Sequence, residues 1–118
     1  MNTAANIAIA LVALLHVYFL VLEMFLWTKP IGLKVFGQSK ESAEASKVLA
    51  ANQGLYNGFL AAGLLWGLSL GQGGYAVKVF VLGCVVAAGI FGAATANRRI
   101  LFVQAWPAAL ALGLLGFA

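Results

Sequence analysis

The chain has 118 residues, of which 64% are hydrophobic and only 8% are charged. A soluble domain of this length cannot bury so much apolar surface, because small folds leave a large share of their surface in solvent. The composition therefore indicates an integral membrane protein with one domain, residues 1–118. The net charge of +4 does not indicate nucleic-acid binding, because the cations lie in gaps between apolar runs.

The first apolar run extends from Ala4 to Trp27 and is long enough to cross a hydrocarbon core of ~30 Å. No lysine or arginine precedes Lys29, so the run lacks the basic start of a signal peptide and is interpreted as a retained helix. Pro30 and Gly32 are predicted to end this helix.

The interval 28–51 is polar and separates the first two spans. Its second half, "SKESAEASKVLAA" from Ser39 to Ala51, is rich in strong helix formers. Glu44 precedes Lys47 by three residues, a spacing that favours an ion pair on a helix surface. We expect a short amphipathic surface helix here, and it can continue into the second span.

Three further apolar runs complete the chain. The stretch "GQGG" at 71–74 is predicted to be a turn, and "NRR" at 97–99 a tight polar break. The predicted fold is all-α, an integral membrane four-helix bundle with the short amphipathic helix on the cytoplasmic side between helices one and two. The expected spans cover about residues 4–27, 52–70, 75–96 and 100–117.

The distribution of cations predicts the orientation. With four crossings, both termini share one side, and only Lys78 lies near that side. The other six of the seven cations lie in the two opposite intervals, which the positive-inside rule assigns to the cytoplasm. We therefore expect a multi-pass protein of the bacterial inner membrane with both termini periplasmic. The six cytoplasmic cations are Lys29, Lys34, Lys40, Lys47, Arg98 and Arg99.

Small residues recur at four-residue spacing within the spans. Gly54, Gly58 and Ala62 form one such stripe in the second span, and Gly83 and Ala87 belong to another in the third. Helices in lipid associate through close packing, which small residues permit. The stripes are explained by packing within one chain, with contact between subunits of a homo-oligomer as the alternative.

The first span carries two ionisable residues, His16 and Glu23, which lie seven positions apart and share a helix face. A carboxyl group inside a span is costly unless it is paired, protonated or wetted. Glu23 is the candidate catalytic acid or base. We expect polar and aromatic side chains to surround it at the cytoplasmic leaflet, with the histidine deeper in the membrane. These candidate ligand-binding residues are His16, Trp27, Asn52, Gln53, Tyr56, Asn57, Thr95, Asn97, Arg98 and Gln104.

Three functions are compatible with this constellation. The first is a polar pocket, open to the cytoplasm, that binds a lipophilic or amphipathic small molecule in addition to membrane lipid. The second is a non-enzymatic component whose polar network fixes helix or subunit packing, and the third is a small transporter. One histidine, one cysteine and no acidic cluster predict no metal site, and no cofactor motif is present. Whether the protein is an enzyme stays open.

Three stretches carry a resemblance to a known family: "HVYFLVLEMFLW", "LAANQGLYNGFLAAGL" and "GIFGAATANRRILFVQAWPAALAL". Together they resemble the bacterial integral-membrane family called domain of unknown function 1304, over nearly the whole chain. The resemblance implies an identity but no established activity. It assigns to the family pattern the polar residues His16, Glu23, Asn52, Gln53, Asn57, Thr95 and Gln104.

In architecture the chain is also similar to the membrane-associated proteins of eicosanoid and glutathione metabolism. Those are four-helix chains with outside termini, and their sites lie between the subunits of a trimer. Their second helix carries an Arg-Ala-x-x-Asn-x-x-Glu pattern, which here would fall on Ala50, Ala51, Gly54 and Asn57. Only Ala51 fits, so this resemblance does not imply glutathione transfer.

Overall fold

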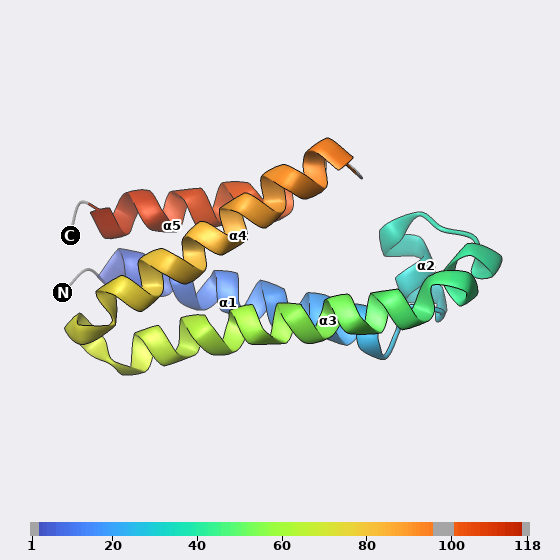
Figure 1. Cartoon of the computed structure of the whole chain (residues 1–118), viewed down its shortest axis with the longest axis horizontal. Helices are drawn as coiled ribbons and strands as arrows, with labels where there is room; N and C mark the ends of the chain where they lie inside the picture. Colours follow the sequence, from blue (N-terminus) through green and yellow to red (C-terminus); the bar gives the residue numbers. More distant parts are fainter. Residues whose placement is uncertain (1–2, 96–100, 117–118) are drawn as a thin grey trace. The chain divides into compact units, whose positions relative to one another are not determined.

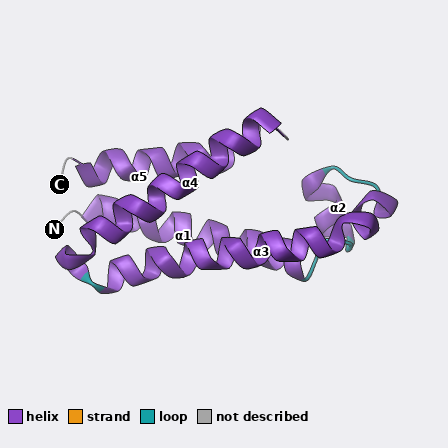
Figure 2. Cartoon of the chain, in the orientation of Figure 1, coloured by secondary structure: helices purple, strands orange, loops and turns teal. Residues whose placement is uncertain are grey.

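A computed structural model describes residues 3–95 and 101–116 (Figure 1). Over these residues all regular structure is helical, which confirms the all-α prediction (Figure 2). The elements in chain order are α1 (Thr3–Met24), α2 (Pro30–Phe36), α3 (Lys40–Ser69), the 3₁₀ helix η1 (Gly71–Gly74), α4 (Tyr75–Thr95), the π-helical turn η2 (Leu101–Ala105) and α5 (Trp106–Gly116).

The chain divides into two compact units. We call residues 1–14 and 60–118 the terminal unit and residues 15–59 the central unit. Helices α1 and α3 each contribute a segment to both units, whereas α2 belongs to the central unit and α4 and α5 to the terminal unit.

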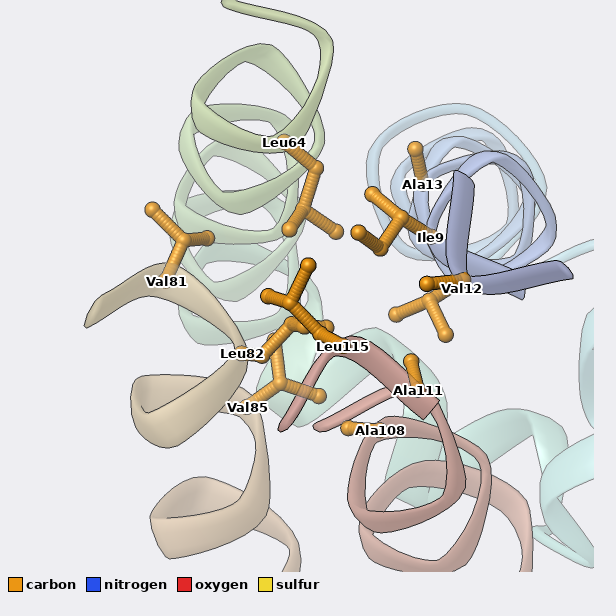
Figure 3. Packing of buried hydrophobic residues seen from close by; sticks show 11 residues of the cluster. Ile9, Val12, Ala13, Leu64, Val81, Leu82, Val85, Ala108, Ala111 and Leu115 are labelled. Carbon is orange, nitrogen blue, oxygen red and sulfur yellow. The ribbon is translucent and has the colours of Figure 1, made fainter. Parts of the chain in front are cut away.

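The hydrophobic core of the terminal unit is made by four helices (Figure 3). Ile9 of α1, Leu64 of α3 and Leu82 of α4 are fully buried and point toward one another, and α5 contributes two alanines and a leucine. The alanines keep α5 close to its neighbours, as is usual where helices pack in lipid. The labelled residues of this core are Ile9, Val12, Ala13, Leu64, Val81, Leu82, Val85, Ala108, Ala111 and Leu115.

Helix α4 does not pack through the stripe of small residues predicted for it, and its buried residues are Lys78, Val81, Leu82, Val85 and Gly89. A Cβ atom built at Gly83 would meet no other described part of the chain within 4 Å, and Ala87 is exposed. The close approach is instead at Gly89, where a Cβ would lie 2.6 Å from the Cβ of Ala105. The prediction that Gly83 and Ala87 form the packed face of this helix is therefore wrong, because the face that packs contains Gly89 instead.

Lys78, the isolated cation of the third predicted span, is 4% exposed. Its ammonium donates to the side-chain oxygen of Asn6 at 3.2 Å and to the carbonyl of Gly71 at 3.4 Å. A Cβ at Gly67 would lie 2.9 Å from the Lys78 Cγ, so this glycine leaves room for the lysine stem. A buried charge needs such partners, because burial without them is strongly unfavourable.

The connection between α1 and α3 corrects one prediction. Helix α1 ends at Met24, before the expected boundary at Trp27, and Lys29 has the extended backbone that a following proline favours (φ −85°, ψ 160°). Pro30 does not simply close the first helix: it is the first residue of α2, a position that suits its fixed φ. Gly32 lies against the carbonyls of the preceding turn, where no side chain would fit.

Capping interactions separate α2 from α3. Gly37 adopts a left-handed conformation (φ 63°) and donates its N–H to the carbonyl of Leu33, which ends α2. Ser39 then accepts the N–H of Ser42 on its hydroxyl at 3.1 Å, a typical start for a helix. From there α3 continues without interruption to Ser69, so the expected surface helix and the second expected span are one helix.

Two helical segments, Thr3–Met24 and Gly71–Thr95, are long and apolar enough to cross a membrane, and Phe102–Gly116 is a shorter apolar helix. Helix α3 does not reach the same hydropathy, because its first half carries charges and amides. Length and composition thus allow these two segments to cross a membrane, and the four-span bundle stays a prediction. The polar break at 97–99 lies outside the described residues.

Candidate functional site

Glu23 and Asn57 meet in the central unit. The Asn57 amide donates to the Glu23 carboxyl with a 2.5 Å separation between Nδ2 and Oε1. Asn57 is 8% exposed and Glu23 is half-buried. The expected contact between the carboxyl of the first span and an amide of the second is therefore present, and it offsets part of the cost of removing the carboxyl from water.

Glycines bring the two helices close enough for this contact. A Cβ at Gly54 would lie 2.6 Å from the Met24 Cγ and 3.2 Å from the carbonyl oxygen of Leu20. One turn further on, a Cβ at Gly58 would lie 2.7 Å from the Leu20 Cδ1. Two members of the predicted stripe, Gly54 and Gly58, thus form the packing surface for α1 and place Asn57 beside the carboxyl, whereas the third member, Ala62, is exposed.

The other polar side chains expected from the same stretch of α3 lie elsewhere. Asn52, Gln53 and Tyr56 are all exposed, and the ring of Tyr56 lies 5.9 Å from that of Phe59. Gln53 was expected to share a face with Asn57, yet it is outside the buried side of the helix. Within the described residues, Asn57 alone of these four is buried at the helix contact.

Trp27 is anchored by contacts that the sequence pattern did not reveal. Its indole N–H donates to the hydroxyl of Ser46 at 3.1 Å, and this hydroxyl donates to the carbonyl of Ser42 at 2.9 Å. The indole ring also packs on Phe36, with ring centroids 4.7 Å apart. These partners come from α2 and α3 (19 residues away along the chain for Ser46), so local spacing gave no signal for them.

A hollow of about 350 Å³ opens beside these residues, entirely within the central unit. It combines one carboxyl group and one ammonium group with apolar and aromatic walls. The ammonium group belongs to Lys47, whose Nζ lies 3.5 Å from Oε1 of Glu44. The lining residues are Glu23, Met24, Phe25, Trp27, Thr28, Lys47, Val48 and Ala51.

His16 is fully buried, and its ring lies edge-on to Phe19 at 5.6 Å. It is not among the residues that line the hollow. Its place in the interior, seven residues before Glu23 along α1, fits a role in helix packing. Among the described residues, no group of three or more His, Cys, Asp or Glu side chains is placed to hold a metal ion.

The remaining candidates belong to the terminal unit. Thr95 is exposed at the end of α4 and donates its hydroxyl to the carbonyl of Phe91 at 2.7 Å. Gln104 is half-buried in η2. Asn97 and Arg98 lie outside the described residues. The convergence of these four side chains on Glu23 stays a prediction.

Comparison with known proteins supplies the family. The family described as protein of unknown function (DUF1304) matches residues 10–116. The chain is also 33% identical over 104 residues to the uncharacterized protein YpaA of Lactococcus lactis subsp. lactis (strain IL1403), covering 86% of this chain and 87% of that protein. No solved structure shows a significant match. Because the match spans nearly the whole chain and includes the entire central unit, the protein belongs to the DUF1304 family.

Proposed function

We propose that this protein is a small multi-pass protein of the bacterial inner membrane that binds a lipophilic or amphipathic small molecule in the hollow beside Glu23. The observation that carries the proposal is a half-buried carboxyl group, bonded to the Asn57 amide, at the edge of a hollow with apolar walls. The apolar segments Thr3–Met24 and Gly71–Thr95 support the membrane location.

The position of the carboxyl group favours binding over packing. An apolar residue at position 23 would extend the hydrophobic face of α1 without any desolvation cost, whereas a carboxyl group near the end of an apolar helix needs compensation. Ionisable groups in such settings commonly serve binding or proton transfer. Glu23 also lines the hollow, so a bound molecule can reach the group, and an acid or base role there follows from the same placement.

A structural role is the second candidate, and specific contacts favour it. The bond from Asn57 to Glu23 ties α3 to α1, and the bond from Trp27 to Ser46 ties α3 to the segment that follows α1. A protein in which these bonds only fix the helices would keep the same geometry without a ligand. The two candidates differ in whether the hollow takes up a molecule.

Tryptophan fluorescence provides the test. The chain has three tryptophans, and Trp66 and Trp106 are more than half exposed, so replacing both with phenylalanine leaves Trp27 as a reporter in the hollow. We expect ω-bromoundecanol, a neutral amphiphile whose bromine quenches indole fluorescence, to quench Trp27 saturably in maltoside micelles.

A matched pair of substitutions identifies the place of binding. Ala51→Phe fills the hollow and should abolish the saturable quenching, while Ala45→Phe adds the same ring at an exposed position of α3 outside the lining and should leave it unchanged. Quenching that rises linearly with probe and is the same in both variants would show only partitioning into the micelle. That result would favour the structural role.

A further inference from the structure

Of the two ionisable side chains that line the hollow, Lys47 has an oppositely charged partner and Glu23 has none among the described residues. Lys47 is paired with Glu44 at 3.5 Å, one helical turn away on α3. Glu23 accepts a neutral amide hydrogen bond from Asn57, and in the part of the chain that the structure describes no cation lies within salt-bridge distance of it. The hollow therefore presents a carboxyl group to which the described residues offer no cationic partner.

The walls of the hollow suit the body of a cationic molecule. Phe25 and Trp27 are aromatic, and Met24 and Val48 are aliphatic. The single N–H of the Trp27 indole is already donated to Ser46, so this ring is left with apolar and cation–π contacts. An anionic head would instead stand beside the Glu23 carboxyl in a partly desolvated setting, where like charges repel strongly.

From this charge balance we infer that the hollow selects amphiphiles with an ammonium head. The ammonium group lies against the Glu23 carboxylate, and the apolar body lies along Met24 and Val48. The inference rests on the proposed function, since it needs the hollow to bind a molecule, and it adds the class of that molecule. A free amine or quaternary ammonium compound and the ammonium head of a phospholipid share this chemistry.

Three probes with one tail test the inference. In the protein whose only tryptophan is Trp27, we compare ω-bromoundecyl chains that end in trimethylammonium, alcohol or carboxylate, in maltoside micelles that contain no ammonium group. We expect the ammonium probe to bind about tenfold more tightly than the alcohol. The carboxylate should bind most weakly. This preference is measured without any change at Glu23, so it does not depend on the folding of a variant there.

Substitutions then assign the preference to one carboxyl group. Glu23→Gln keeps an acceptor for Asn57 and should lower the affinity for the ammonium probe about tenfold, to that of the alcohol. Retained alcohol binding shows that this variant is folded. Glu41→Gln is the matched control, because it removes an exposed acid from the first turn of α3 that does not line the hollow. It should leave all three affinities unchanged.

The outcomes separate the two proposals. Equal saturable binding of the three probes, lost in Ala51→Phe, would support a ligand-binding hollow and overturn the selection of cations. Saturable binding by none of them would overturn both. If the ammonium probe is preferred, short-chain phosphatidylethanolamine and hexylamine are each added as competitors of the bound probe. Displacement by the phospholipid identifies a lipid head as the ligand, and displacement by hexylamine alone identifies a free amine.

Discussion

Replacing Asn57 with alanine removes the one described hydrogen-bond donor to the Glu23 carboxyl. Asn57 is 8% exposed, so little water can reach the carboxyl through the space that the amide leaves. Glu23 is half-buried and keeps some access to water of its own. A buried polar group left without its partner costs about 1–3 kcal/mol. Because Glu23 retains partial hydration, we expect the lower part of that range, and the free energy of unfolding should fall by about 1–2 kcal/mol.

Glu23→Gln is the matched comparison for this change. It removes the ionisable group but leaves a side-chain oxygen that the Asn57 amide can still use, so the free energy of unfolding should change by less than about 1 kcal/mol. In a double-mutant cycle with Glu23→Ala and Asn57→Ala, the two losses should not add, because both variants remove the same bond. The coupling energy should be about 1 kcal/mol.

Unfolding by sodium dodecyl sulfate in mixed maltoside micelles, followed by circular dichroism at a helical wavelength, measures these differences. Two results would refute the reasoning. If Asn57→Ala is as stable as the parent protein, the amide bond does not hold α1 to α3. If Glu23→Gln loses about 3–5 kcal/mol, Glu23 is one partner of a buried ion pair rather than of a neutral amide bond.

Three further predictions concern the orientation and the terminal unit. A C-terminal alkaline phosphatase fusion should be active and a green fluorescent protein fusion dark, and the reverse pattern would place the termini in the cytoplasm. Asn6→Leu removes an acceptor of the buried Lys78 ammonium and should lower the free energy of unfolding by about 1.5–3 kcal/mol. The loss should be clearly smaller in a Lys78→Met background, and equal losses in the two backgrounds would show that Asn6 does not stabilise the fold through Lys78. Gly89→Val should destabilise the fold by about 1–3 kcal/mol, because the new side chain would collide with Ala105. Gly83→Val places its side chain in open space and should leave the stability unchanged. Chemical unfolding of both variants measures the difference, and equal stabilities would contradict the packing of Gly89 on Ala105.

Local sequence determined where the helices lie. The apolar runs at the start of the chain and after "GQGG" became α1 and α4, because a continuous apolar segment of this length favours a helix whose backbone bonds are satisfied internally. Ser39 capped α3 as its hydroxyl permits. Pro30 was identified as a break, but the sequence prediction missed that it also begins α2, since a helix of seven residues has little periodicity of its own.

The tertiary structure decided which faces meet. Along α1 and α4 nearly every position is apolar, and large side chains such as Leu11, Leu14 and Phe80 are exposed in the chain while Leu82 is buried. Such helices have no polar side that marks the outer face, so composition cannot fix their rotation. Contacts between distant segments fix it instead, as the close approach at Gly89 shows.

The same division holds at the candidate site. The sequence determined that Glu23 needs a partner, because a carboxyl group at the end of an apolar helix is costly wherever the helix lies. It could not choose among the amides of α3, because residues three and four positions apart differ in direction by only a fraction of a turn. The close packing at Gly54 settled the rotation of α3, buried Asn57 against the carboxyl and left Gln53 exposed.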